Sequence, residues 1–212
     1  MNSMNVIDSV VFFGCACGEP GDENFDSARA TAKAVAQTGR RVVNGGGPGI
    51  MLAATLGAKD GGGKTTAVYY RPELATTFEG KSAVNFADEK FEEANYILRT
   101  KRLLELGDTY IVFNGGTGTL SEFAMAWGLA RLYFGHHKPL ILYGEFWHHL
   151  IGAFRKHLIG RPEEYRVFTI VTSPDEVLAA LEKYEVIIQA NRHNHPVCHA
   201  KDTESECSFL LL

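Results

Sequence analysis

The chain has 212 residues, of which 45% are hydrophobic and 22% are charged, and its formal net charge is −4. This length and composition suit one globular domain with a full hydrophobic core. No basic cluster stands out, which argues against nucleic acid as the main partner, and no stretch approaches the roughly 20 apolar residues of a membrane span.

Hydrophobic periodicity predicts alternating strands and helices in the first third of the chain. The expected elements are a strand over residues 6–13, a helix over 22–38, a strand over 41–44, a helix that residues 45–51 open and that runs to about 58, and a strand over 65–70. The first strand is almost continuously apolar, as in a parallel strand that is buried on both faces. Gly39 is a typical stop for the first helix.

The same alternation continues to residue 184. We expect a connection over residues 71–83, a short strand over 84–87, a helix over 89–106 with an apolar side that includes Ile97 and Leu98, a strand, a glycine turn and a helix over 109–129, a strand over 139–143, a helix over 145–158, a strand over 167–171 and a helix over 173–184. Ser173, Pro174 and Glu176 form a capping-box pattern at the start of that last helix.

Strands that alternate with helices at this spacing predict an α/β fold, an open parallel sheet with helices on both faces. We expect a single domain over residues 1–188 and a partly disordered tail over 189–212, where periodicity is lost. In such sheets ligands bind outside the carboxyl ends of the strands. The glycine-rich segments 45–51 and 115–119 both follow strands, so we expect them to face one crevice.

The glycine turn from Gly115 to Thr119 is the strongest candidate for a binding site. Its glycines let the backbone come close to a ligand, and the free N–H groups of the helix start suit an anion such as phosphate. Glu122, in the first helical turn, is a candidate catalytic acid, although a plain helix-start carboxylate has the same pattern. Arg99 is expected to clamp a phosphate or pair with Glu122, unless it is a solvated helix-face cation.

Other residues leave alternatives open. The small-residue loop from Gly14 to Gly18 indicates either a close ligand or a tight turn. The segment from Gly45 to Met51 matches neither the dinucleotide fingerprint nor a P-loop. Four aromatic side chains suit either a stacked base or the core: Tyr69, Tyr70, Phe113 and Trp127.

The cysteines are expected to be free thiols in a reducing cytoplasm, because the start of the sequence lacks the pattern of a secretory signal. They are Cys15, Cys17, Cys198 and Cys207. A metal site is the alternative for part of the tail, with His193, His195, Cys198 and His199 as its ligands.

Two motifs carry a family resemblance. Gly45-Gly46-Gly47-Pro48-Gly49-Ile50-Met51 and Asn114-Gly115-Gly116-Thr117-Gly118-Thr119-Leu120-Ser121-Glu122 resemble the Lonely Guy (LOG) family. That family was long labelled lysine decarboxylase and includes cytokinin riboside monophosphate phosphoribohydrolases. Its second motif is Pro-Gly-Gly-x-Gly-Thr-x-x-Glu. Asn114 stands here where the family has Pro, and Thr100 stands where Lys usually follows the catalytic Arg.

The resemblance implies a Rossmann-like fold, a homodimer or larger oligomer, and hydrolysis of a nucleoside 5′-monophosphate, AMP or a cytokinin type, to free base and ribose 5-phosphate. It implies that Glu122 and Arg99 are catalytic, and it requires no metal or cofactor. The phosphate-binding loop falls on Gly116, Thr117, Gly118 and Thr119. Beside it, we expect Gly14, Gly46, Gly47, Gly49, Met51 and Gly115 to complete the substrate site.

A non-catalytic carrier of a nucleotide or a phosphorylated cofactor on the same fold is the main alternative, because a fold does not fix a function. A DNA-binding role is weaker, since no basic face is visible. We do not expect lysine decarboxylation, because nothing in the sequence indicates a pyridoxal phosphate site with its Schiff-base lysine.

Overall fold

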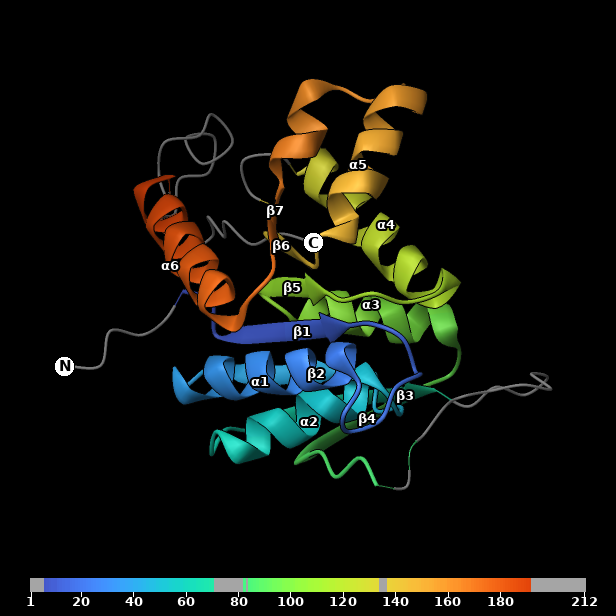
Figure 1. Cartoon of the computed structure of the whole chain (residues 1–212), viewed down its shortest axis with the longest axis vertical. Helices are drawn as coiled ribbons and strands as arrows, with labels where there is room; N and C mark the ends of the chain where they lie inside the picture. The colour runs from blue at the N-terminus through green and yellow to red at the C-terminus, as the bar shows by residue number, and fades with distance from the viewer. Residues whose placement is uncertain (1–5, 71–81, 83, 134–136, 192–212) are drawn as a thin grey trace, which may run out of the picture.

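Seven parallel strands and six α-helices make up the computed structural model, which describes residues 6–70, 82, 84–133 and 137–191 (Figure 1). The strands are β1 Ser9–Phe13, β2 Arg41–Asn44, β3 Thr65–Tyr70, β4 Glu89–Glu93, β5 Thr109–Val112, β6 Leu140–Tyr143 and β7 Phe168–Val171. The helices are α1 Glu23–Gln37, α2 Ile50–Asp60, α3 Tyr96–Leu106, α4 Thr117–Leu132, α5 Phe146–His157 and α6 Pro174–Asn191, with a short 3₁₀ helix at Pro162–Arg166.

The strands form one sheet in the order β4-β3-β2-β1-β5-β6-β7, and every neighbouring pair is parallel. The chain winds outward from β1 to β4 and then returns to place β5 on the other side of β1. The order therefore reverses between β1 and β5, and this reversal is where open α/β sheets bind their ligands. The predicted α/β fold, an open Rossmann-like parallel sheet in a single domain, is confirmed.

Helices cover both faces of the sheet because successive side chains of a buried strand point to opposite sides. Val10 and Phe12 of β1 belong to the core under α1, α2 and α6. Val11 and Phe13 belong to the core under α3, α4 and α5. The apolar run of the first strand therefore supplies two cores, as its composition predicts.

Two predicted elements near residue 90 are wrong. Residues 89–93 form the edge strand β4, which pairs with β3 through Val68 and Phe91, and residues 84–87 are not a strand. Glu and Lys favour a helix locally, but at the sheet edge their side chains reach solvent while Phe91 packs on the core. Helix α3 begins only at Tyr96, after the Asn95 side chain caps it by accepting from the Leu98 N–H at 2.9 Å.

The buried face of α3 also differs from the expected one. Arg99, Thr100, Leu103 and Leu104 are its buried residues. The side chains of Ile97 and Leu98, which were expected on the apolar side, are 63% and 40% exposed. The helix therefore directs Arg99 inward.

The last helix runs longer than the sequence pattern indicates, to Asn191 instead of 184. Its predicted cap is present in part. The Ser173 hydroxyl accepts from the Glu176 N–H at 3.3 Å, while the Glu176 carboxylate accepts from the Thr172 N–H at 2.7 Å. The predicted tail beyond residue 191, and the predicted connection over 71–83 except residue 82, lie outside the described residues.

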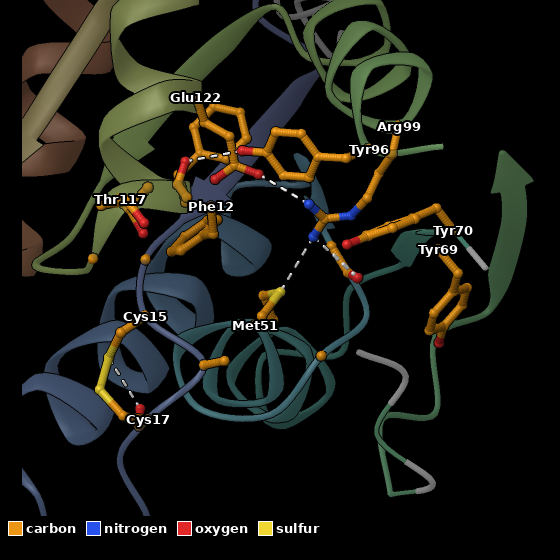
Figure 2. A pocket seen from close by; sticks show the side chains of 18 residues that line it. Phe12, Cys15, Cys17, Met51, Tyr69, Tyr70, Tyr96, Arg99, Thr117 and Glu122 are labelled. Carbon is orange, nitrogen blue, oxygen red and sulfur yellow. Dashed lines mark hydrogen bonds and ion pairs between the residues drawn. A yellow bond between two sulfur atoms is a disulfide. The ribbon is translucent and has the colours of Figure 1, made fainter. Parts of the chain in front are cut away.

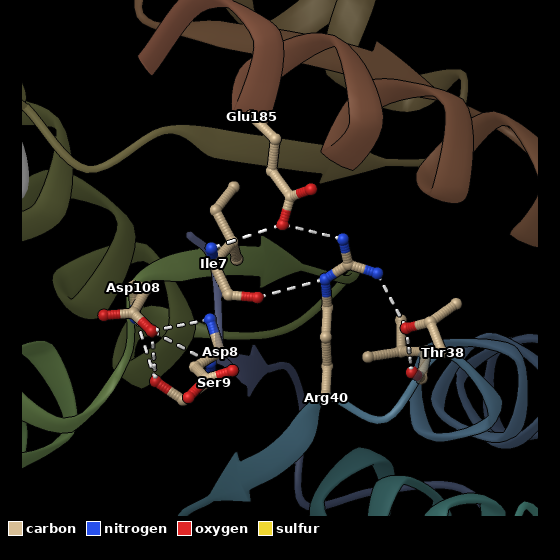
Figure 3. Close-up of polar contacts among 8 residues, drawn as sticks. Ile7, Asp8, Ser9, Thr38, Arg40, Asp108 and Glu185 are labelled. Carbon is tan, nitrogen blue, oxygen red and sulfur yellow. Dashed lines mark hydrogen bonds and ion pairs between the residues drawn. The ribbon is translucent and has the colours of Figure 1, made fainter. Parts of the chain in front are cut away.

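A buried arginine ties α6 to the start of the sheet (Figure 3). Arg40 is 5% exposed and donates to the Ile7 carbonyl at 3.1 Å, to the Thr38 hydroxyl at 2.7 Å and to the Glu185 carboxylate at 2.9 Å. The same Glu185 oxygen accepts from the Ile7 N–H at 3.3 Å. This cluster lies at the amino ends of the strands, away from the glycine-rich loops, so its role is to hold the fold.

Candidate functional site

A pocket of about 570 Å³ opens at the carboxyl ends of the central strands (Figure 2). Its size falls within the range of small-molecule sites. The ends of strands β1 and β3, the loops after β1, β2 and β5, and helices α2, α3 and α4 supply its lining. The lining consists of Phe12, Phe13, Gly14, Cys15, Ala16, Cys17, Gly45, Gly47, Met51, Tyr69, Tyr70, Tyr96, Arg99, Gly116, Thr117, Gly118, Thr119 and Glu122. The loops after β1, β2 and β5 therefore meet at one crevice, as predicted from the sequence pattern.

The amino end of α4 forms one wall of the pocket. Gly116 is the N-cap residue and offers no side chain to the first N–H groups of the helix. The first backbone bond recorded at this end is Leu120 N–H to the Gly116 carbonyl, at 3.0 Å. Residues 116–118 are exposed. The open N–H groups and the positive end of the helix dipole can together hold a phosphate.

Arg99 extends from α3 into the pocket and contacts β3, the loop after β2, α2 and α4 (Figure 2). It donates to the Val68 carbonyl at 3.1 Å, to Glu122 Oε1 at 3.1 Å and to the Gly45 carbonyl at 3.3 Å. Its Nη2 also lies 3.6 Å from Met51 Sδ. Only 9% of Arg99 is exposed. The prediction that Arg99 meets Glu122 is thus realised in the geometry, and the side chain is not a solvated helix-face cation.

Glu122 is a buried residue of α4, with 6% of it exposed. It lies in the second turn and not in the first as expected, because the helix begins at Thr117. Burial raises the pKa of Glu122 to about 7, and the nearby Arg99 guanidinium opposes that rise through its charge and its hydrogen bond. Among the described residues, Oε1 carries the hydrogen bond recorded for this carboxylate, the one from Arg99. Oε2 is therefore the oxygen available to a ligand or water. A carboxyl group with a pKa near neutrality can gain or lose a proton during a reaction.

A buried amide network holds the loop after β2. Asn44 donates to the Thr55 hydroxyl at 2.9 Å, which in turn donates to Asn85 Oδ1 at 2.7 Å. Asn44 Oδ1 accepts from the Gly46 N–H at 2.8 Å, and Asn85 Nδ2 donates to the Gly47 carbonyl at 3.0 Å. The sequence pattern does not identify this network, because its members lie on three separate segments.

The predicted substrate-binding residues divide into two groups. Nine residues with predicted site roles line the pocket: Gly14, Gly47, Met51, Arg99, Gly116, Thr117, Gly118, Thr119 and Glu122. The other three, Gly46, Gly49 and Gly115, do not line the pocket, but a side chain at any of them would collide with neighbouring residues. A Cβ on Gly49, whose φ is +62°, would lie 2.4 Å from the Cys17 carbonyl oxygen, and one on Gly115 would lie 2.2 Å from Thr119 Oγ1.

Tyrosine side chains form a second wall of the pocket, the aromatic wall, which adjoins the amino end of α4. Tyr69 and Tyr70 line the pocket, while Phe113 and Trp127, the other two candidates for stacking, belong to the cores. The rings of Tyr70 and Tyr96 meet edge to face at 6.0 Å, and the Tyr96 hydroxyl donates to the Gly118 carbonyl at 3.1 Å. Tyr96 was missed because it falls inside the segment expected to be mid-helix. Its position just after the cap Asn95 is the signal that could have identified it.

Cys15 and Cys17 are joined by a disulfide, which corrects the expectation of free thiols at these two positions. The chain bends at Ala16, and the two Cα atoms are 5.1 Å apart, within disulfide range. The other two cysteines and the histidines of the alternative metal site lie outside the described residues.

Within residues 6–70, 84–133 and 137–191, no cluster of three or more His, Cys, Asp or Glu side chains is placed to hold a metal ion. In the same part of the chain, no helix is both long and apolar enough to cross a membrane.

Fold and pocket together define an α/β protein with a Rossmann-like sheet and a site suited to a small anionic ligand at the topological switch point. Comparison with known proteins gives the family. A family model described as "Possible lysine decarboxylase" matches residues 51–181. The chain therefore belongs to this lysine decarboxylase-like, or LOG, family.

The chain is similar to several known proteins at low sequence identity. An uncharacterized protein of Archaeoglobus fulgidus is 30% identical over 109 residues, which are 51% of this chain and 68% of that protein. The structure of a molybdenum cofactor binding protein from Rippkaea orientalis has a TM-score of 0.63 at 22% identity and covers 86% of this chain and 99% of its own. The Moco carrier protein of Chlamydomonas reinhardtii has a TM-score of 0.62 at 18% identity and covers 87% and 99%.

Proposed function

We propose that this protein hydrolyses the N-glycosidic bond of a nucleoside 5′-monophosphate, of the AMP or cytokinin type, and releases the free base and ribose 5-phosphate. One observation carries the proposal. A buried carboxyl group, Glu122, is held by Arg99 at 3.1 Å on the same helix end whose open N–H groups suit a phosphate. An anion site and a group able to transfer a proton therefore lie within one pocket. Family membership supports the same reaction class.

The phosphate end of the substrate would rest on the N–H groups of residues 116–119, where the helix dipole favours negative charge. The ribose would then lie over Glu122, and the base would extend toward the aromatic wall. Tyr70 and Tyr96 provide planar, partly exposed rings at that wall. A nucleobase can stack on such rings through its π-face, and this stacking does not depend on its hydrogen-bonding groups.

Glu122 would act at the anomeric carbon. In its ionised form it stabilises positive charge that develops on the ribose as the bond to the base breaks. It also accepts a proton from the water that forms the new bond to the anomeric carbon, and the departing base nitrogen takes up a proton. Arg99 would have a different task, because it contacts Glu122 directly and also donates to the carbonyls of Val68 and Gly45. It positions the carboxylate and completes the loop after β2.

The deciding experiment is a panel of nucleoside 5′-monophosphates with separate measurement of free base and ribose 5-phosphate. We expect equal amounts of both products, and a loss of at least about 100-fold in turnover for Glu122→Gln. Arg99→Ala should also lose turnover, while Glu182→Gln, an exposed carboxylate on α6, serves as the matched control. Wild-type turnover in Glu122→Gln would remove the role proposed for this residue.

A homodimer is part of the proposal. Ile97, Leu98 and Leu120 are exposed near the amino ends of α3 and α4, beside the pocket. Apolar groups gathered on a surface favour association. One chain has a mass of 23.3 kDa, and light scattering after size-exclusion chromatography should give twice that mass. The Ile97→Lys variant should give a lower mass than the wild type. A monomeric wild type would contradict this part.

A second candidate is a carrier that binds a phosphorylated cofactor without cleaving it. The likeness to the two molybdenum cofactor proteins, across 86% and 87% of this chain, favours it. The same helix end suits the phosphate of such a ligand, and Asn114 and Thr100 depart from the family motifs. Thr100 is fully buried and donates to the Tyr96 carbonyl at 3.0 Å. Tight binding of molybdenum cofactor, together with AMP that stays intact, would favour the carrier over the hydrolase.

A further inference from the structure

The segment Cys15-Ala16-Cys17 is packed between the two glycine-rich loops of the pocket. The Cys15 N–H donates to the Asn114 carbonyl at 3.1 Å, and the Cys15 carbonyl accepts from the Ile50 N–H at 3.0 Å. It therefore links the loop after β5 to the first residue of α2. All three of its residues line the pocket.

The segment lies close against a glycine of each loop. A Cβ on Gly49 would lie 2.4 Å from the Cys17 carbonyl oxygen and 2.5 Å from that of Cys15. A Cβ on Gly115 would lie 2.8 Å from the Cys15 nitrogen. Both loops therefore lie directly against the backbone of the cysteine pair.

The two sulfur atoms differ in access. Cys17 is exposed, whereas Cys15 is half-buried under the Asn24 amide, whose nitrogen lies 3.9 Å from the Cys15 sulfur. A partner for the reduced form is already placed, because the Cys15 sulfur lies 3.1 Å from the Cys17 carbonyl oxygen and can donate to it as a thiol. Both the bonded and the reduced states thus have contacts in this fold.

We propose that Cys15 and Cys17 form a thiol–disulfide exchange site at the pocket mouth, which reacts with small thiols and adjusts both ligand loops. In the reduction step, a thiolate attacks the exposed Cys17 sulfur, the bond between the two cysteines breaks, and Cys15 leaves as a thiolate and takes up a proton. A second reductant thiolate then attacks the reductant sulfur of the mixed disulfide and releases Cys17. The protein gains two electrons, and the reductant becomes a disulfide.

The experiment uses the full chain with Cys198→Ser and Cys207→Ser, so that thiol counts report on Cys15 and Cys17 alone. The protein is equilibrated with dithiothreitol or with oxidised glutathione, alkylated and analysed by peptide mass spectrometry. We expect both thiols to react after reduction, neither to react after oxidation, and the change to reverse. Persistent glutathione adducts, disulfide-linked dimers or two thiols that never oxidise would overturn the proposal.

Amide hydrogen exchange tests the coupling to the loops without any ligand. Exchange over residues 45–51 and 114–119 should differ between the two redox forms, and Cys17→Ser should show no redox dependence. Unchanged exchange in both loops would contradict the coupling. Affinity for inorganic phosphate and for AMP is then compared, with an expected ratio of at least about fivefold between the forms. If neither form binds either probe, the proposed function fails, while the exchange site still stands or falls on thiol counts and hydrogen exchange.

Discussion

Replacing Glu122 by Gln should make the stability of the protein respond differently to pH. Burial raises the pKa of Glu122 from its ordinary 4.5 to about 7 in the folded protein, while the unfolded chain returns it to the ordinary value. Between pH 4.5 and 7 the folded state therefore holds a proton that the unfolded state has released. The favourable contribution of this group is present at low pH and is lost as pH rises through about 7.

The size of the effect follows from the shift. One pKa unit corresponds to about 1.4 kcal/mol, so the contribution lost between pH 5 and pH 8 amounts to about 2 to 3 kcal/mol of unfolding free energy. Glutamine matches the neutral carboxyl group in shape and does not titrate. Relative to wild type, Glu122→Gln should therefore gain about this much as pH rises from 5 to 8. Other titrating groups are present in both proteins and cancel in the difference.

Urea unfolding at pH 5, 6, 7 and 8 measures this difference. The two proteins must have equal denaturant slopes for the comparison to hold, since a changed slope indicates a changed folded or unfolded state. Glu182→Gln removes an exposed carboxylate and is the control. Its unfolding free energy should differ from that of the wild type by the same amount at each pH. If the difference between Glu122→Gln and wild type is also independent of pH, the buried, proton-binding carboxyl group inferred here does not exist.

Two further predictions compare matched pairs of variants by urea unfolding. Arg40→Ala should lower the free energy of unfolding by about 3 to 5 kcal/mol, because it leaves the partly buried Glu185 carboxylate without its ion-pair partner. Arg41→Ala removes an exposed ion pair at 3.1 Å and should lower it by at most about 1 kcal/mol. Equal losses would contradict the structural role of the buried cluster. Gly118→Ala should leave folding intact or improve it by up to about 1 kcal/mol, since a Cβ there meets only a tyrosine hydroxyl at 4.0 Å, yet it should weaken phosphate binding in a titration. Gly115→Ala should instead destabilise the fold by about 1 to 3 kcal/mol, because its Cβ would lie 2.2 Å from Thr119 Oγ1. If Gly118→Ala binds phosphate as well as the wild type does, the amino end of α4 is not the anion site.

Much of the fold could be predicted from the sequence because local pattern and tertiary environment agree. The apolar runs of β1 and β5 are buried on both faces, and their burial gives the same signal as their composition. The edge strand β4 could not be predicted in this way. Its Glu-Lys-Phe-Glu-Glu sequence has helix-forming residues, and only the pairing with β3, more than 20 residues away, makes it a strand.

In the candidate site, too, local features could be predicted from the sequence and contacts between distant segments could not. The glycine turn before α4 is local, so its residues could be named from the sequence, and the carboxyl edge of a parallel sheet fixes where they lie. The partners that hold the site come from distant segments. Asn85 reaches the loop after β2, and Tyr96 reaches the amino end of α4. No periodicity encodes such contacts, since they depend on how far apart the folded elements stand.

Arg99 connects these two kinds of information. The family resemblance implies that Arg99 is a functional residue, but not which of two tasks it performs, binding phosphate or holding Glu122. The structure shows the contact with Glu122 through Nη1, while Nε and Nη2 donate to the carbonyls of Val68 and Gly45. An anion at the end of α4 can be held by backbone N–H groups and the helix dipole, and Nη1 of Arg99 carries a second N–H that allows a further contact. Hydrolase and carrier share that end of the pocket, so the difference between them rests on whether the second oxygen of Glu122 meets a ligand atom that can react.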